Sequence, residues 1–213
     1  MTSTLARKPQ PLSKGGKTAA RIRAAALDLF SRHGFDGVST ADIAAAARVS
    51  QPAVLYHFRD KDDLWRSAML SLAPLMNAPE PLAGIENAKR SALGRLRLLM
   101  HHYVRLSHEN PALGRVFMRE GMGGGPRLKW LIENVFGESH KLQMKLVRQA
   151  ISDGELRPYH PEQIIIMMYA AASTFRILAP YSKAAFNSIA GNPKTCGAHE
   201  NLFIEVLFRG LEL

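Results

Sequence analysis

The strongest constraint on the fold lies between residues 38 and 61, where the start signals of two short helices follow one another closely. Ser39 can cap a helix, and Asp42 three residues later completes the pattern of a capping box. Ser50 can cap the next helix, and Pro52 in its first turn removes no N–H that the helix needs. Two short helices that meet at a tight turn predict a helix-turn-helix.

The rest of the chain shows helical spacing of apolar residues and no alternating pattern that would predict a strand. The expected helices cover residues 17–33, 39–47, 51–58, 60–76, 85–108, 111–119, 126–152, 161–178 and 198–211. Residues 78–81 are expected to form a loop, and the glycine-rich segment 121–126 a mobile hinge. We therefore predict an all-α fold of about nine helices, with a three-helix DNA-binding head and a larger helical body.

The apolar residues of the helix-turn-helix should form its inside. They are Ile43, Ala47, Val49, Val54 and Phe58. The stripe expected to face them from the first helix consists of Ala20, Ala24, Leu27 and Phe30. Small residues at 44–47 allow the two helix axes to approach closely.

The outer side of the second short helix has the size and chemistry to enter a DNA major groove. Gln51 stands at its start, where a side-chain amide can pair with adenine in two-point fashion. Ala53 is small enough to lie against a thymine methyl group, and Thr40 and Lys61 begin neighbouring helices from which they could bind phosphate. The predicted DNA-binding residues are Thr40, Arg48, Gln51, Pro52, Ala53, Tyr56, His57 and Lys61.

The charge of the chain favours a polyanionic partner. The formal net charge is +10, and residues 1–24 carry six basic groups and no acidic group. Residues 1–16 are expected to form a disordered basic arm that suits DNA, although an anionic membrane surface or a solubilising tail would explain the same charges. No apolar run follows these charges as in a signal peptide, and Ile164–Ala172 is too short to span a bilayer, so we expect a cytoplasmic protein that does not enter membranes.

A family resemblance rests on three segments. Phe30-Ser31-Arg32-His33-Gly34-Phe35 ends the first helix, Val38-Ser39-Thr40-Ala41-Asp42-Ile43-Ala44 opens the second, and Tyr56-His57-Phe58 is followed by Lys61 and Leu64. This pattern, over residues 17–76, resembles the tetracycline-repressor (TetR) family. The resemblance implies an all-α homodimer that binds a palindromic DNA operator and is released by a small effector. It also implies that residues 77–213 form the effector-binding and dimerisation domain.

Two positions depart from the family pattern. Arg48 stands where the family often has Gly at the turn, so it must tolerate a left-handed backbone. Leu55 stands where the family usually has a Tyr that contacts phosphate, so that contact is lost or passes to Tyr56. The role of the head is therefore better determined than the contact of any one residue.

The body carries no motif of comparable strength. Flexible and aromatic side chains suited to an apolar or aromatic effector, together with one arginine among apolar neighbours, are Met100, Tyr103, Phe117, Met118, Trp130, Met144, Met168, Phe175 and Arg176. Apolar stripes on the last two expected helices, formed by Phe175, Leu178, Phe203, Val206 and Leu207, could pair with a second copy. Both sets could equally belong to the core.

Other classes of protein find less support. His101 and His108 are two helical turns apart, about 10 Å, which is too far for one metal ion without further ligands. Cys196 is the single cysteine, and no serine lies in a Gly-x-Ser-x-Gly elbow. We expect no cofactor, no metal and no catalytic residue. The alternatives left open are a sequence-nonspecific architectural DNA-binding protein and a helical enzyme.

Overall fold

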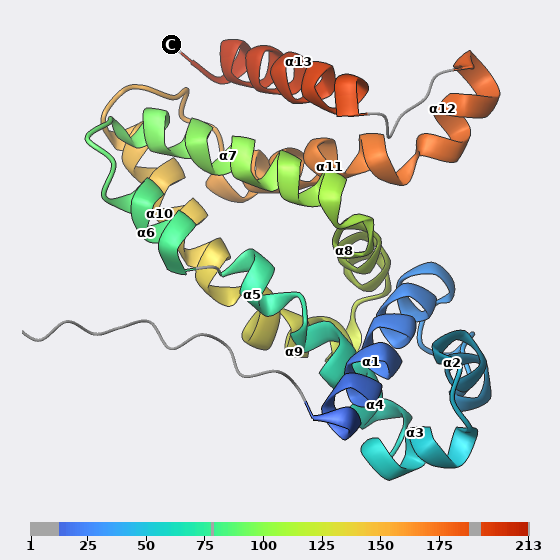
Figure 1. Cartoon of the computed structure of the whole chain (residues 1–213). Coiled ribbons are helices and arrows are strands. Elements are labelled where there is room, and N and C mark those ends of the chain that lie inside the picture. The colour runs from blue at the N-terminus through green and yellow to red at the C-terminus, as the bar shows by residue number, and fades with distance from the viewer. Residues whose placement is uncertain (1–12, 78, 188–192, 213) are drawn as a thin grey trace, which may run out of the picture. The chain divides into compact units, whose positions relative to one another are not determined.

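The computed structural model describes residues 13–77, 79–187 and 193–212, and every regular element in these ranges is helical. The elements are α1 (Lys14–His33), α2 (Thr40–Ala47), α3 (Gln51–His57), α4 (Lys61–Leu70), α5 (Ala73–Met76), α6 (Pro79–Glu86), α7 (Ala92–Glu109), α8 (Pro111–Gly123), α9 (Gly125–Leu131), the π-helical turn η1 (Ile132–Phe136), α10 (Gly137–Ser152), α11 (Pro161–Ile177), α12 (Ala179–Phe186) and α13 (Pro193–Leu211) (Figure 1). An isolated β-bridge joins Leu156 to Glu212. The expected all-α class is confirmed.

The chain forms two compact units, one up to Ala68 and one from Met69 onward. This division falls before the expected boundary after residue 76. Of the expected basic arm, residues 1–12 lie outside the described part of the chain. Residues 14–16 are helical rather than disordered, because the Ser13 hydroxyl accepts a hydrogen bond from the Gly16 N–H at 3.1 Å and caps α1.

In the first unit, α1 packs against α2 and α3. Its buried apolar face is Ile22, Ala26 and Phe30, at a regular spacing of four residues. The expected stripe was wrong except at Phe30, since Ala24 is exposed and Leu27 is only half-buried. The longer aliphatic side chain of Ile22 sets the buried face, because it removes more apolar surface from water than an alanine does.

Two expected helices are divided in the structure. The helix predicted for residues 60–76 ends at Leu70, and α5 begins with Pro74 in its first turn. A proline cannot continue a helix interior because it lacks the N–H and its ring clashes with the preceding turn. The helix predicted for residues 126–152 is interrupted by η1.

The interruption at η1 has a visible cause. The Asn77 amide donates to the Val135 carbonyl at 2.7 Å, and its oxygen accepts from the Ser139 N–H at 3.2 Å. In a continuous α-helix these two backbone groups would bond to each other. One side chain from another segment therefore replaces a helical hydrogen bond.

Four further boundaries differ from expectation, and together with η1 they raise the number of helices above the nine expected. The segment 78–81 was expected to be a loop, but α6 begins at Pro79. The helix expected from residue 85 begins at Ala92, where Ser91 caps it. Glycines 121 and 123 lie within α8, and the break between α8 and α9 is confined to Gly124 at φ 65° and Gly125 at φ 81°, so no long hinge is formed. The helix α12, with Pro180 in its first turn, was not expected.

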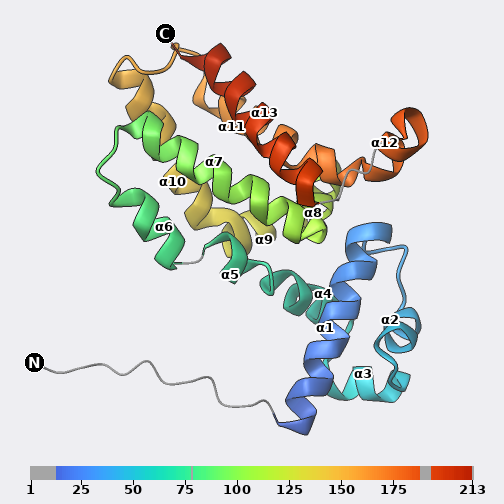
Figure 2. The same ribbon diagram turned by 45° about the horizontal axis from the view of Figure 1, so that its top comes forward.

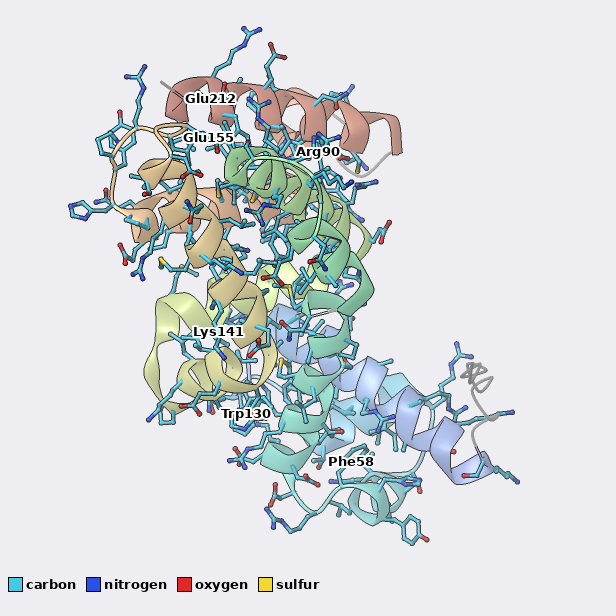
Figure 3. The ribbon with its side chains drawn as sticks, turned by 90° about the vertical axis from the view of Figure 1, so that its left-hand side faces the viewer. Phe58, Arg90, Trp130, Lys141, Glu155 and Glu212 are labelled. Atoms are coloured by element: carbon cyan, nitrogen blue, oxygen red, sulfur yellow. The ribbon has the colours of Figure 1, made fainter. Side chains whose placement is uncertain are left out.

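The second unit is built around α7, which contacts α10, α11 and α13 (Figure 2). Its core includes Leu96, Leu99, Leu146 and Phe208, all with under 2% of their surface exposed. Figure 3 shows Glu155 and Glu212 at one end of this unit. Glu155 accepts the Leu93 N–H at 2.9 Å and Glu212 pairs with Arg97, so both carboxylates fix the start of α7. Among the described helices none is long and apolar enough by itself to cross a bilayer. Only α11 and α12 together, bent by 62°, meet that criterion of length and composition.

Candidate nucleic-acid interface and body cavity

The start of α2 is fixed by a reciprocal capping box. The Asp42 carboxylate accepts hydrogen bonds from the Ser39 N–H at 2.8 Å and from the Ser39 hydroxyl at 2.6 Å. The Asp42 N–H donates to the same hydroxyl at 3.1 Å. The hydrogen bond from the Ser39 side chain is the largest cause that lowers the pKa of Asp42. The predicted capping box is therefore present.

The turn between α2 and α3 depends on one left-handed residue. Arg48 has φ 52° and ψ 51°, as its position in place of the family's usual glycine predicted. Its N–H bonds to the Ala45 carbonyl at 3.1 Å, and the Val49 N–H bonds to the Ala44 carbonyl at 3.0 Å. These bonds offset the cost of placing a side chain in that conformation. The Arg48 side chain is exposed.

The second short helix, α3, separates a buried side from an exposed one. Val54 and Phe58 are buried with 1% and 6% of their surface exposed, whereas Tyr56 is 85% exposed. Leu55 is 52% exposed, so α3 presents an apolar side chain beside Tyr56. Pro52 occupies the first turn as expected, but the Ser50 side chain makes no capping hydrogen bond. Ala53 is half-buried and Pro52 is exposed.

Two predicted DNA contacts touch each other. The Gln51 amide donates to the Thr40 hydroxyl at 3.1 Å, which joins the starts of α3 and α2. The bond uses one of the two amide hydrogens and leaves the Gln51 side chain exposed. Thr40 therefore orients a side chain that can still pair with a base edge in two-point fashion.

The end of α3 and the start of α4 bring basic groups together. The Lys61 ammonium lies 4.3 Å from the centre of the Phe35 ring, so a cation–π contact holds it at the start of α4. His57 packs edge-on against Tyr56 at 5.2 Å. Asp60 caps α4 by accepting the Asp63 N–H at 2.7 Å. All eight predicted DNA-binding residues lie in the first unit, between the start of α2 and the start of α4.

The second unit encloses a small cavity of about 20 Å³. It is lined by Met76, Tyr103, Ser107, Leu113, Gly114, Phe117, Phe136, Tyr169, Ala172 and Ser173. Of the nine predicted effector-binding residues, the lining includes only Tyr103 and Phe117. The cavity holds about one water molecule, so the aromatic side chains of the core fill most of the expected effector site.

The other seven predicted residues lie elsewhere. Met100 and Met168 are fully buried core residues, each with 1% of the surface exposed. Phe175 stacks on His199 at 4.2 Å, and Trp130 lies on α9 (Figure 3). Met118, Met144 and Arg176 are half-buried and do not line the cavity.

Sequence reasoning missed the polar groups near this cavity. The rings of Tyr169 and Phe117 are tilted by 34° with 5.0 Å between their centres, and Gln143 on α10 is 1% exposed. Burial raises the pKa of Tyr103 to about 12 and raises that of Tyr169, because it disfavours the phenolate. Gln143 follows Ser139 by one helical turn within an apolar stripe. This placement of two polar residues within an apolar stripe is the sequence feature from which their burial could have been predicted.

A groove of about 690 Å³ runs between α11 and α13. Its lining includes Met167, Leu202 and Val206, which are 44%, 61% and 62% exposed. Of the expected dimer stripe, Phe203, Val206 and Leu207 line this groove, whereas Phe175 and Leu178 do not.

The histidines do not form a metal site. His101 pairs with Glu200 at 2.7 Å, whereas His108 stacks on Phe175 and His199. No group of three His, Cys, Asp or Glu side chains with metal-binding geometry occurs among residues 13–77, 79–187 and 193–212.

Two family comparisons cover most of the chain. Residues 22–68 match the family of bacterial regulatory proteins named tetR, and residues 72–188 match the family described as the YcdC-like protein, C-terminal region. The second match alone spans more than half of the chain.

The chain is also similar to individual transcriptional regulators. The HTH-type transcriptional regulator RutR of Escherichia coli K12 is 28% identical over 170 residues, with 76% of each chain covered. The ketosteroid transcriptional regulator KstR2 of Mycobacterium tuberculosis has the same fold, with a TM-score of 0.70, 17% identity, and coverage of 96% of this chain and 97% of that one. HlyIIR, a hemolysin II transcriptional regulator, gives a TM-score of 0.69 at 18% identity and covers 94% of this chain and 99% of its own.

The helix-turn-helix geometry, the helical second unit and the two family matches lead to one assignment. The chain belongs to the TetR family of bacterial regulatory proteins, which bind DNA as transcriptional regulators and are not enzymes.

Proposed function

We propose that this protein is a homodimeric repressor that binds a palindromic operator through α3 of each copy and leaves it when a small effector occupies the second unit. The observation that carries the proposal is the exposed start of α3. There the Gln51 amide nitrogen donates a hydrogen bond to the Thr40 hydroxyl at 3.1 Å. An amide at the exposed start of a recognition helix can read adenine through two hydrogen bonds.

The neighbouring residues supply complementary contacts. The exposed Leu55 offers an apolar surface to a thymine methyl group or a sugar, and the exposed Tyr56 offers a hydroxyl to phosphate. Lys61, at the start of α4, offers its ammonium group to the phosphate backbone. Arg48 adds an exposed positive charge at the turn. These contacts position the protein, whereas Gln51 supplies base preference.

Dimerisation would follow from the groove between α11 and α13. Exposed Met167, Leu202 and Val206 cost free energy in water, and a symmetric partner that inserts the same side chains would bury them. A Val206→Asp substitution should convert the dimer into monomers, as measured by sedimentation. The matched control is Ile132→Asp, which changes a 42% exposed apolar residue on η1 outside the groove. Equal dimerisation of both variants would contradict this interface.

The effector would bind where the cavity beside Tyr103 and Phe117 lies. A ligand shifts the DNA-binding equilibrium only by the difference between its affinities for the DNA-free and DNA-bound forms. The covalent route from this unit to the recognition helix is α4, which begins at Lys61 and ends at Leu70.

Selection from a pool of random duplex DNA tests the DNA-binding proposal. A repressor of this kind should enrich one palindromic sequence whose two halves are separated by about one helical turn. The selected duplex should then compete at least about a thousandfold better than unrelated DNA at physiological salt. Enrichment of no sequence, together with a steep salt dependence, would instead indicate the architectural DNA-binding alternative.

A further inference from the structure

Four of the buried side-chain polar atoms that make no hydrogen bond to a described residue belong to three neighbouring side chains of the second unit. They are the hydroxyls of Tyr103 and Tyr169 and both amide atoms of Gln143. The nearby Ser139 hydroxyl is already used, because it donates to the Phe136 carbonyl at 2.7 Å. Ser139 and Gln143 lie near enough to Tyr103 and Tyr169 to lower the pKa of both phenols. The two hydroxyls and the Gln143 amide nevertheless do not meet the geometric criteria for a hydrogen bond.

Such a concentration of unsatisfied groups is unusual in a folded core. Most buried side-chain polar atoms in proteins have a partner, and each unpaired group costs free energy. These atoms come from three helices, since Tyr103 lies on α7, Gln143 on α10 and Tyr169 on α11. One guest molecule between the helices could therefore satisfy several of them at once.

The cavity beside these atoms restricts the guest further, and its lining includes Tyr103 and Tyr169 but not Gln143. The rings of Tyr103, Phe117 and Tyr169 line the cavity, with 5.0 Å between the centres of Phe117 and Tyr169. Aromatic walls favour a flat ligand. No charged side chain lines the cavity, so a charged ligand would lose its hydration without gaining a partner.

We propose, on the basis of the proposed effector function, that the effector is a small, neutral, planar molecule with adjacent hydrogen-bond donor and acceptor groups. Its polar edge pairs with both amide atoms of Gln143 and with the hydroxyls of Tyr103 and Tyr169. Its face packs on Phe117 and Tyr169. This inference narrows the apolar or aromatic effector expected from the sequence, because a ligand without polar groups would leave all four polar atoms unpaired.

Because the cavity is small, ligand binding must change the packing of the second unit. A space of about 20 Å³ holds one water molecule and no six-membered ring, so binding must displace Phe117 or a neighbouring ring. Phe117 is half-buried and lies on α8, where Gly114 approaches Ser173 closely enough that an added methyl group would lie 3.0 Å from its Cβ. Ligand entry therefore requires a change in the packing of α8 against α11.

The test uses calorimetry of the full chain with four small probes. The planar donor–acceptor probes are 2-pyridone and benzamide, and the controls are toluene, which is apolar, and benzoate, which is charged. The wild-type protein should bind at least one planar probe at least about tenfold more tightly than either control. If neither planar probe binds more tightly than toluene, the inference is overturned.

Two variants on α10 separate recognition from structure. Gln143→Leu removes the buried amide at similar volume and should abolish the preference for the planar probe. Gln149→Leu is the matched control, because Gln149 is exposed on the same helix and bonds only to Asp153 at 2.7 Å. Equal probe affinity of the two variants would overturn the inference.

The thermal midpoint provides an independent measurement. Without ligand, Gln143→Leu should unfold at the same temperature as wild type or higher, because an unpaired amide is replaced by an apolar group of similar shape. A midpoint several degrees lower would assign the amide a structural role and contradict the proposal.

Binding to the selected DNA distinguishes the two proposals. If the Gln143→Leu variant keeps sequence-specific DNA binding but shows no probe preference, the repressor proposal stands and Gln143 acts in ligand binding alone. Conversely, probe preference in a protein without sequence-specific DNA binding supports the ligand class and refutes the repressor proposal.

Discussion

The two units of this protein use polar groups in opposite ways. In the first unit the informative polar side chains are exposed and paired locally, as Ser39 is with Asp42 and Gln51 is with Thr40. In the second unit they are buried and unpaired, as Gln143 and Tyr169 are. We propose that the first arrangement serves the binding of DNA and that the second serves the binding of a small ligand. A ligand shifts an equilibrium between two packings only by the difference between its affinities for them, and groups that pair only with the ligand can supply that difference.

The largest expected effect concerns the core of the first unit. Phe30→Ala should lower its free energy of unfolding by about 3–5 kcal/mol, because Phe30 is 2% exposed and the lost side chain leaves a cavity. Urea unfolding followed by circular dichroism measures the change. The control, Tyr56→Ala, removes an aromatic residue that is 85% exposed and should change stability little. Similar losses in both variants would contradict the assignment of this core.

The next effect tests the exposed polar surface directly. Gln51→Ala should weaken binding to the selected operator by about 1–3 kcal/mol and relax preference at one base pair, because the two-point contact is lost. Fluorescence anisotropy with the operator and its single-base variants measures this. Gln149→Ala, on the second unit, should leave binding unchanged. An equal loss of affinity for operator and random DNA would make Gln51 a backbone contact only.

A smaller effect is expected from the capping box. Ser39→Ala should cost about 1 kcal/mol of stability, since it removes the group that accepts the Asp42 N–H. Ser50→Ala is the matched control, because the Ser50 side chain makes no capping hydrogen bond. Chemical unfolding of both variants should separate them, and the same midpoint for each would show that the box contributes nothing.

Lys61 tests whether the basic groups bind phosphate. Lys61→Ala should make the dependence of log affinity on log salt shallower by about one unit per subunit, for operator and random DNA alike. Filter binding between low and moderate salt measures the slope. Lys141→Ala, on α10 in the other unit, serves as the control (Figure 3). An unchanged slope would remove Lys61 from the interface.

The smallest effect concerns the dependence of stability on pH, which we expect to arise from histidines of the second unit. Burial lowers the pKa of His102, His108, His140 and His199, all in the second unit. Each prefers its neutral form when folded, so its contribution to stability is present above the ordinary value of 6.5 and is lost as the pH falls through the lower folded-state pKa. Stability should therefore decline below about pH 6.5.

His140 allows that decline to be assigned. His140→Phe should make the dependence of unfolding free energy on pH shallower, because the phenyl ring does not titrate and can pack against Phe136 and Tyr169 as the imidazole does. Urea titrations at several pH values between 5 and 8 measure the slope. An unchanged slope would show that His140 does not contribute.

The helix-turn-helix was predictable because its determinants are local. Ser39 and Asp42 form their box within one turn, and the left-handed Arg48 was expected because it stands where the family often has Gly. The inward Val54 and Phe58 left Tyr56 to face outward on so short a helix. The hydrogen bond from Gln51 to Thr40 was not predictable, because it depends on how α2 and α3 approach.

The second unit was less predictable because its determinants are distant in sequence. Asn77 interrupts the helix around Val135 from far along the chain, and no local pattern signals such a contact. Apolar and aromatic residues recur throughout the body helices, so composition could not show that Met168 is core whereas Phe117 borders the cavity.

The sequence by itself determined the all-α class, the helix-turn-helix and the exposure of Gln51 and Tyr56 on α3, because caps, turns and helical periodicity act over a few residues. Only the tertiary structure decided which aromatic rings meet, that Gln143 and two tyrosines from three helices converge, and how small the space between them is. Burial depends on the packing of segments far apart in the chain, so a local sequence pattern does not determine it.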